Sequence, residues 1–382
     1  MPFSGSTFTN VSGASTAVAG DIVQSAVWDN IHLDYATAFT QTMQQLIAGI
    51  TNRNILWMNG GLEIWQQGNS LTISAGVTQY TADRWYVTTN ANQTTGVGTG
   101  TGLSTNSNIS GFVQRNSGQT GVGAYTYGYP LDTDELYRIR GNKVSLSFLA
   151  VAGSGFTPAN GTLTVALYVG TGAVAKRGVG FTGETNVLTI ATNLTPGGAA
   201  VAISGNSSAI VPATATQGEL QFTWTPVGTA PVGDFIRLDD IMLESQLTSA
   251  WTPTSFDRVD FPTMLNGCKR FYSKTMSYGI TPASGTGGYQ NALGTNVGSI
   301  QSPFIWWQFP VEMRATAGIT TYNPITATNS NWHDLITSVD LTVSVQATNT
   351  GARSTIIFAA TATTTVVPLN MFFIHAAASA GI

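Results

Sequence analysis

The sequence predicts a mainly β protein that contains an N-terminal α-helix, a central jelly-roll β-sandwich and a small C-terminal β-sandwich. Two observations carry this prediction. Charged residues make up 9% of the 382 residues, whereas ordinary globular domains have about 25%, so hydroxyl and amide side chains must supply most of the polar surface. The 42 glycines separate short segments rich in Thr and Val. Such segments are typical of strands joined by tight turns.

The length allows more than one core, and three domains are expected. Residues 1–53 would be an arm and a helix. Residues 54–258 would be the jelly-roll domain, and residues 259–382 the C-terminal β-sandwich.

The first domain contains one helical pattern. Gly20 breaks the chain and Asp21 is a suitable N-cap for a helix over Ile22–Ile50, where apolar residues recur at steps of three and four. No other long helical pattern exists in the sequence, so this stripe must pack on the β domain, on copies of itself or on another protein. The residues that we assign to attachment or oligomerisation are Trp28, Ile31, Tyr35, Phe39, Met43 and Leu46.

The second domain reads as a series of about eight or more strands. Its opening stretch, Asn54–Trp85, consists of short apolar runs cut by Gly and Asn. The Gly-rich residues 96–102 lack the spacing of a phosphate-binding loop and are predicted to be a hairpin loop. Alternating segments predict strands at Gly123–Tyr129, Lys143–Val151, Leu163–Val169, Val187–Ile190, Leu220–Trp224 and Phe235–Glu244.

The third domain is also divided into short strands by Gly, Ser, Asn and Thr. These strands are predicted at Ile305–Phe309, Ala317–Tyr322, Leu341–Gln346, Thr355–Ala360 and Met371–His375. The uncharged, apolar run Ala359–Val367 would be prone to aggregate as a free edge. Burial between copies of the chain would remove this hazard.

Several motifs together resemble bacteriophage tail-fibre and appendage proteins that contain a carbohydrate-binding-like jelly roll. NGGLEIWQQG at 59–68 and RLDDIMLESQ at 237–246 resemble the two ends of that domain, although Leu62 replaces the usual Phe. Cys268–Lys274 and Phe309–Thr316 resemble paired motifs that follow it, and Asp21–Asn30 resembles short N-terminal helices of tail proteins. The resemblance implies a homotrimer located in a virion.

The same resemblance implies a structural calcium site where the first and last strands of the jelly roll meet. Glu63 and the pair Asp239 and Asp240 are the candidate ligands, since Ca²⁺ prefers hard oxygen donors. The alternative is that these carboxylates pair with Arg237 or Arg84 at a strand edge. No other cofactor is required.

Tyr125, Tyr127 and Tyr129 alternate along one predicted strand, so all three project from the same face. Aromatic faces are common platforms for sugar rings, which makes these tyrosines candidates for glycan binding. The alternative is that the row belongs to the core or to a subunit interface.

Several function classes are not favoured by the sequence. The net charge is −4 and the 15 basic residues are scattered, which argues against nucleic acid as a partner. The longest apolar stretches are far shorter than a membrane span, so no membrane insertion is expected. The three histidines match no catalytic motif, and the acidic cluster Asp132–Glu135 reads as a solvated loop. We therefore do not expect an enzyme.

The resemblance, with which the composition agrees, implies a structural fibre protein of a bacteriophage virion, made in the host cytoplasm. The N-terminus would bind another virion protein of the tail or capsid, and the β domains would bind host-surface glycans. The alternatives are a head fibre or capsid-decoration protein, a cellular carbohydrate-binding module and a glycan depolymerase.

Overall fold

The computed structural model describes residues 8–9, 16–17, 53–246, 254–286, 303–327, 330–341, 345–359 and 370–381. The chain divides into two compact units, Met1–Arg53 and Asn54–Ile382. In the first unit, β1 (Phe8–Thr9) and β2 (Thr16–Ala17) form a short antiparallel pair. The predicted helix over Ile22–Ile50, with its six attachment residues, lies outside the described residues.

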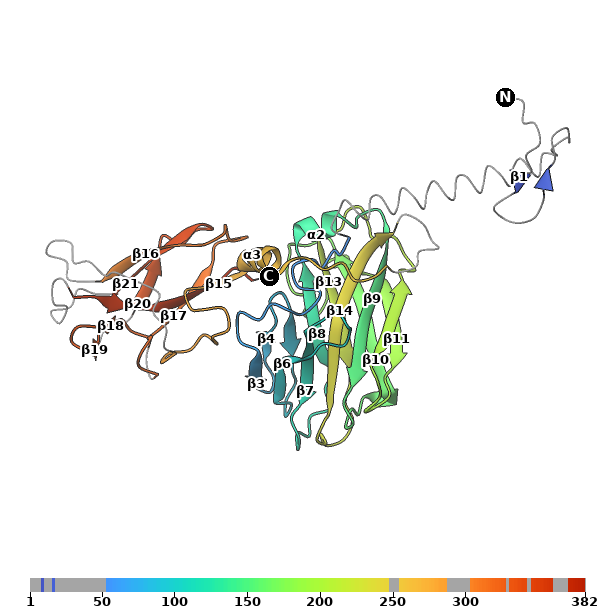
Figure 1. Ribbon diagram of the computed structural model, residues 1–382, viewed down its shortest axis with the longest axis horizontal. Helices are drawn as coiled ribbons and strands as arrows, with labels where there is room; N and C mark the ends of the chain where they lie inside the picture. The colour runs from blue at the N-terminus through green and yellow to red at the C-terminus, as the bar shows by residue number, and fades with distance from the viewer. Residues whose placement is uncertain are drawn as a thin grey trace, which may run out of the picture. The chain divides into compact units, whose positions relative to one another are not determined.

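The prediction of a mainly β protein is confirmed, and the larger part of the second unit consists of two six-stranded antiparallel sheets (Figure 1). The first sheet has the order β11 (Thr185–Asn193), β10 (Thr162–Gly170), β13 (Gln217–Trp224), β8 (Tyr125–Leu131), β5 (Tyr86–Thr88) and β4 (Thr78–Tyr80). The second has the order β12 (Val201–Asn206), β9 (Lys143–Ala152), β14 (Phe235–Gln246), β7 (Ile109–Arg115), β6 (Thr95–Thr101) and β3 (Ser70–Ile73).

One hydrophobic core joins the two sheets. Val165 and Leu167 of β10 belong to the same buried cluster as Leu146 of β9. Phe148 of the second sheet meets Phe222 of the first edge to face, with 5.1 Å between ring centroids. The two sheets therefore form a sandwich, while the jelly-roll arrangement of its strands stays a prediction.

The opening stretch of the domain forms turns that hydrogen-bond to β14. The amide of Ile55 donates to the carbonyl of Leu243 over 2.8 Å, and the side chain of Asn54 donates to the carbonyl of Ile241 over 3.1 Å. At Gly60 a Cβ would lie 2.3 Å from the Ile241 carbonyl oxygen, so only glycine fits. The two ends of the domain, far apart in sequence, contact each other, but the opening stretch forms turns in place of the predicted first strand.

Two local predictions are wrong. Residues 96–102 are not a hairpin loop, since Thr95–Thr101 forms strand β6. Its glycines allow close approach: a Cβ on Gly98 would lie 2.4 Å from the Asn69 carbonyl oxygen. The acidic cluster is not a solvated loop either, because Thr133–Tyr137 forms helix α2 with a capping box between Asp132 and Glu135. Glu135 is buried in an ion pair of 2.7 Å with Arg84.

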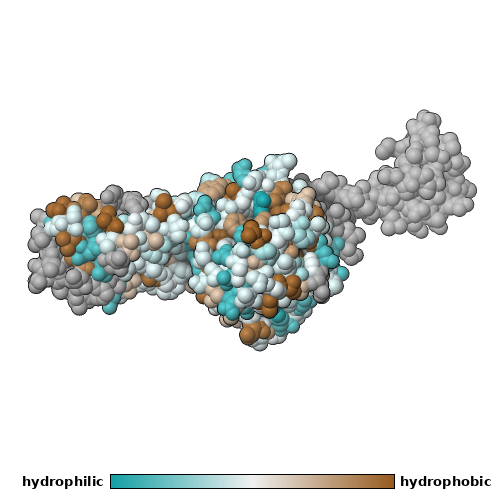
Figure 2. Space-filling model, turned by 90° about the horizontal axis from the view of Figure 1, so that it is seen from below, coloured by the Kyte–Doolittle hydropathy of each residue, from teal (hydrophilic) through white to brown (hydrophobic). Residues whose placement is uncertain are grey.

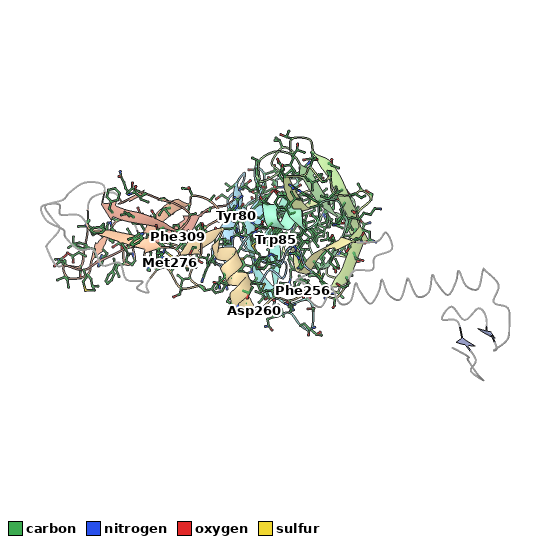
Figure 3. The ribbon with its side chains drawn as sticks, turned by 90° about the horizontal axis from the view of Figure 1, so that it is seen from above. Tyr80, Trp85, Phe256, Asp260, Met276 and Phe309 are labelled. Carbon is green, nitrogen blue, oxygen red and sulfur yellow. The ribbon has the colours of Figure 1, made fainter. Side chains whose placement is uncertain are left out.

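The C-terminal part begins with α3 (Phe261–Lys269), a helix that the sequence reading missed because it spans only 9 residues. Asp260, at one end of α3 in Figure 3, caps it by accepting a hydrogen bond of 3.0 Å from the Thr263 amide. Short antiparallel strands follow in three three-stranded sheets: β15 (Tyr272–Lys274), β23 (His375–Ser379) and β17 (Gly318–Tyr322); β16 (Phe304–Gln308), β21 (Ser354–Ala359) and β20 (Val345–Thr348); β19 (Val339–Asp340), β18 (His333–Asp334) and β22 (Phe372–Phe373).

The remaining short element is a 3₁₀ turn over Ala159–Gly161 that leads into β10. Within the described residues, neither helix combines the length and the hydropathy needed to cross a bilayer.

Candidate functional site

The three tyrosines predicted as a glycan platform point into the sandwich. Tyr125, Tyr127 and Tyr129 are 0%, 1% and 0% exposed. Tyr127 stacks on Trp85 with ring centroids 4.9 Å apart, and Tyr125 stacks on Trp224 at 5.0 Å. The alternation along β8 was read correctly, but the face they share is the core face, so no ring surface is open to a sugar.

The outer face of the same sheet carries a row of five threonines. Strand pairing places Thr78, Thr88, Thr126, Thr223 and Thr164 opposite one another across β4, β5, β8, β13 and β10. We call these five residues the threonine row. Each is at least partly exposed, and the hydroxyls of Thr78 and Thr88 lie 2.9 Å apart. Since neighbouring strands are about 4.8 Å apart, the row presents hydroxyls at regular intervals across five strands.

A second group of polar and aromatic side chains lies next to the threonine row on the same face. It consists of Tyr80, Tyr86, Tyr168, Glu219 and Gln221, which we call the outer tyrosine cluster. Tyr80 and Tyr86 pair across β4 and β5, and their rings meet edge to face at 6.2 Å. Glu219 and Tyr168 pair across β13 and β10.

The ring of Tyr86 lies across the neighbouring strand at Gly128. A Cβ on Gly128 would lie 2.6 Å from that ring, so glycine is required beneath it. The Tyr86 hydroxyl thereby reaches Glu219 and donates a hydrogen bond to it. Gln221 donates a second hydrogen bond of 2.6 Å to the same carboxylate oxygen.

Glu219 is fully buried within this cluster. Burial raises the pKa of its carboxyl, while the hydrogen bonds from Tyr86, from the backbone amide of Arg177 and from Gln221 act in the opposite direction. The pKa of Tyr86 is also raised, first by its burial and then by the neighbouring carboxylate. The cluster is thus a preorganised polar network.

The loop over residues 171–184, between β10 and β11, contributes two cations to this face. The backbone amide of Arg177 donates to Glu219 over 2.8 Å, and its guanidinium lies 3.7 Å from the centroid of the Tyr168 ring. The same guanidinium makes a two-pronged ion pair with Glu184, at 2.7 and 2.8 Å. The ammonium of Lys176 lies over the rings of Tyr80 and Tyr86, 4.6 and 5.4 Å from their centroids.

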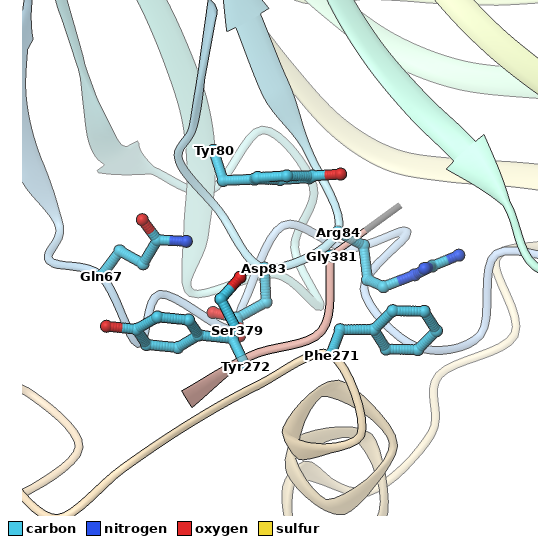
Figure 4. Close-up of a pocket in the computed structure, with 8 residues that line it drawn as sticks. All are labelled: Gln67, Tyr80, Asp83, Arg84, Phe271, Tyr272, Ser379 and Gly381. Atoms are coloured by element: carbon cyan, nitrogen blue, oxygen red, sulfur yellow. The ribbon is translucent and has the colours of Figure 1, made fainter. Parts of the chain in front are cut away.

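A small cavity lies beside Tyr80. Its volume of about 20 Å³ suits roughly one water molecule, and its lining residues are Gln67, Tyr80, Asp83, Arg84, Phe271, Tyr272, Ser379 and Gly381. Figure 4 shows Tyr80 on one side, Phe271 and Tyr272 on the other, and Asp83 between them. The cavity is too small for a sugar ring.

Asp83 belongs to a buried network at this cavity. Burial raises the pKa of Asp83 to about 7, although the amide and side chain of Gln66 donate to it over 2.7 and 2.6 Å. Burial also lowers the pKa of Lys274 to about 8, and its ammonium donates to the carbonyl of Gln66 over 2.6 Å. These contacts tie β15 to the sandwich, which indicates a structural role.

The carboxylates predicted to hold calcium meet a guanidinium instead. Arg258 pairs with Glu63 and, over 2.5 Å, with Asp240. Asp239 accepts hydrogen bonds from the Leu103 amide at 2.8 Å and from the Ser107 hydroxyl at 3.1 Å. Burial raises the pKa of Asp239 to about 6.

This donor set fits a cationic side chain better than Ca²⁺, which needs six to eight oxygen ligands. Among the described residues, no group of three or more His, Cys, Asp or Glu side chains is arranged to hold a metal ion. The calcium site stays a prediction, which titration calorimetry with Ca²⁺ and melting in the presence of a chelator would test.

Hydrophobic side chains on the surface are mostly dispersed. Figure 2 shows them scattered among pale and hydrophilic residues on the face that it presents. Among the described residues, the most solvent-exposed aromatic side chain is that of Trp306 in β16, at 68%. Scattered apolar residues of this kind are normal for protein surfaces.

No protein-family model and no curated protein matches the chain. Among solved structures, the enzymatically active domain of Bacteriophage CBA120 tailspike protein 4 aligns with 13% identity over 51% of this chain and 22% of its own, with a TM-score of 0.30. A CBM22-1 xylan-binding domain from Paenibacillus barcinonensis aligns with 16% identity over 45% and 97%, at 0.29. A cyclase from Fischerella sp. TAU aligns with 11% identity over 47% and 100%, also at 0.29. Likenesses this weak do not assign a function.

The threonine row and the outer tyrosine cluster were not predicted from the sequence. A signal for them exists in β13, where Glu219, Gln221 and Thr223 alternate with the buried Leu220, Phe222 and Trp224. That alternation marks one polar face and one core face. It does not reveal that Tyr80 and Tyr86, from a distant part of the chain, lie on the same polar face.

Proposed function

We propose that this chain is a structural fibre protein of a bacteriophage virion, and that the outer face of its first sheet binds host-surface glycans. The observation that carries the glycan part is the threonine row, with the outer tyrosine cluster beside it. The fibre part is supported by the sequence motifs at 59–68, 237–246 and 309–316, which resemble those of phage fibre proteins.

The chemistry of the face suits an uncharged or weakly charged polymer. Each threonine hydroxyl both donates and accepts hydrogen bonds, as do the hydroxyls of sugars. Tyr80 is partly exposed beside the row, and aromatic rings offer an apolar face with a polar tip. A chain of sugars lying across the strands would meet a hydroxyl at each strand.

The face is also preorganised. The buried side chains of Tyr86 and Gln221 support it from below through hydrogen bonds to Glu219, and strand pairing fixes the spacing of the threonines. A site that is rigid before binding loses less conformational entropy when the ligand arrives. Extended saccharides are flexible, so a rigid partner is an advantage.

A glycan array tests the binding site. The wild-type chain is expected to bind a subset of bacterial surface glycans, and the double variant Thr126→Val with Thr223→Val is expected to lose most of this binding. Ser147 of β9 lies on the second sheet between the buried residues Leu146 and Phe148, so Ser147→Ala is the matched control and should bind like the wild type. Equal binding by the wild type and the double variant would overturn the site.

The proposed activity is binding without cleavage. Incubation of a bound glycan with the chain should release no new reducing ends. Release of reducing ends would replace this proposal with that of a depolymerase.

Within the virion, we assign residues 1–53 to attachment and expect a homotrimer. The apolar stripe over Ile22–Ile50 and the motif resemblance support this assignment. Deletion of residues 1–53 should abolish incorporation into particles, and light scattering of the full chain should give three times the monomer mass of 40.1 kDa. Electron micrographs of labelled particles would distinguish a tail fibre from a head fibre or decoration protein.

A further inference from the structure

The cation of Lys176 lies at the edge of the proposed glycan face. Its ammonium stands over the rings of Tyr80 and Tyr86. These tyrosines are two residues away from Thr78 and Thr88 along β4 and β5, which corresponds to about 7 Å. A saccharide on the threonine row would therefore have the ammonium beside it.

Lys176 differs from its neighbour Arg177 in how its charge is balanced. Arg177 is neutralised by the two-pronged pair with Glu184. No salt bridge joins Lys176 to any carboxylate of the described residues. The two tyrosine rings supply only a cation–π interaction.

The carboxylates near Lys176 are already engaged. Glu184 is held by Arg177 and by the amide of Phe181, which donates to it over 2.8 Å. Glu219 accepts hydrogen bonds from Tyr86, Gln221 and the Arg177 amide. Burial lowers the pKa of Lys176, while the charge of Glu219 raises it. A partly buried cation that forms no salt bridge within the described part of the chain favours an anion that arrives from outside.

We propose that the face prefers acidic saccharides, and that Lys176 binds the carboxylate of a sugar acid placed on the threonine row. This inference rests on the proposed glycan-binding function and specifies its ligand class. The position of the loop supports it: the Arg177 amide is fixed to Glu219 and the Thr171 amide donates to the Thr182 carbonyl over 2.9 Å, so Lys176 is presented from an anchored loop.

The test uses an array on which oligosaccharides containing uronic or sialic acids are printed beside their methyl esters. The esters keep the sugar backbone and lose the charge. The wild-type chain is expected to bind the acids roughly fivefold more tightly than the esters, the value for an ion pair of about 1 kcal/mol. This preference should shrink as ionic strength rises, because salt screens the pair.

The variant Lys176→Met keeps an unbranched apolar stem over the tyrosine rings and removes the charge. Its binding of each acid should fall to the level of the corresponding ester. Lys143→Met, in β9 of the second sheet, is the charge-matched control and should keep the preference. Thermal melting of both variants should match the wild type.

The outcomes separate this inference from the proposed function. Equal binding of acids and esters by the wild type, or a preference that persists in Lys176→Met, overturns the role of Lys176. In that case, sensitivity of binding to Thr126→Val with Thr223→Val leaves the glycan face standing. Absence of binding to every printed glycan overturns both.

Discussion

The two faces of the first sheet carry tyrosines with opposite roles. Tyr125, Tyr127 and Tyr129 lie on the inner face and fill the core against Trp85 and Trp224. On the outer face, Tyr86 uses its hydroxyl to bind the buried carboxylate of Glu219. The difference shows that alternation places tyrosines together on one face of a strand, while the neighbouring elements decide whether that face builds a core or a polar network.

The largest loss of stability is expected for the tyrosines on the inner face of the sheet. Tyr127→Ala removes a buried ring stacked on Trp85 and should lower the free energy of unfolding by about 3–5 kcal/mol, through lost burial and the cavity left behind. Urea denaturation measures this change. Tyr137 of α2 is 57% exposed, and Tyr137→Ala should cost less than about 1 kcal/mol. Similar losses for the two variants would contradict the assignment of Tyr127 to the core.

The next largest effect is expected for Tyr86 of the outer tyrosine cluster, and it depends on pH. Tyr86→Phe removes one hydrogen-bond donor from the buried Glu219. The free energy of unfolding should therefore fall by about 1–3 kcal/mol at pH 7. The pKa of Glu219 is raised in the folded chain, so between its unfolded and folded pKa the folded state holds more protons and stability falls as pH rises. Loss of the Tyr86 hydroxyl raises this pKa further.

The loss of stability caused by Tyr86→Phe should therefore be larger at pH 7 than at pH 4, where the Glu219 carboxyl is mostly protonated in both states. Urea denaturation of the wild type and the variant at the two pH values measures this difference. Tyr137→Phe is the control and should show none. An equal loss of stability at both pH values would show that Tyr86 does not stabilise the ionised form of Glu219.

Much of the sandwich could be predicted because buried apolar residues recur at every second position along its core strands. Lys143–Val151 was predicted as a strand, and β9 spans Lys143–Ala152. The predicted Leu163–Val169 corresponds to β10 over Thr162–Gly170. Strand β6 was missed because its glycines are required by close contacts with other segments, and such contacts leave no local pattern.

The polar sites could not be predicted in the same way, because each unites distant parts of the chain. Glu63 and Asp240 were correctly placed near each other, but Arg258 as their shared partner was not foreseen. Glu135 looked solvated in sequence, yet Arg84, 51 residues away, holds it in the interior. Charge pairs of this kind depend on tertiary packing, about which a local acidic cluster carries no information.

A smaller loss of stability is expected when a threonine that faces the core, in contrast to those of the threonine row, is replaced. Thr95 of β6 is buried and its hydroxyl lies 2.9 Å from that of Tyr125, while it donates over 2.8 Å to the carbonyl of Gln93. Thr95→Val leaves these buried groups unpaired and should cost about 1–2 kcal/mol. Chemical denaturation measures the loss. A neutral result would show that the Tyr125 hydroxyl finds another partner.

The smallest change in stability is expected for Thr126→Val, the outer counterpart of Thr95→Val. Valine keeps the β-branched shape that strands favour, and Thr126 is partly exposed in the folded chain, so the substitution buries no new polar group. The free energy of unfolding should change by less than about 0.5 kcal/mol, whereas glycan binding should weaken. A variant that keeps its stability and loses binding would show that the outer hydroxyls serve recognition. Loss of stability with unchanged binding would instead assign the threonine row to the packing of the sheet.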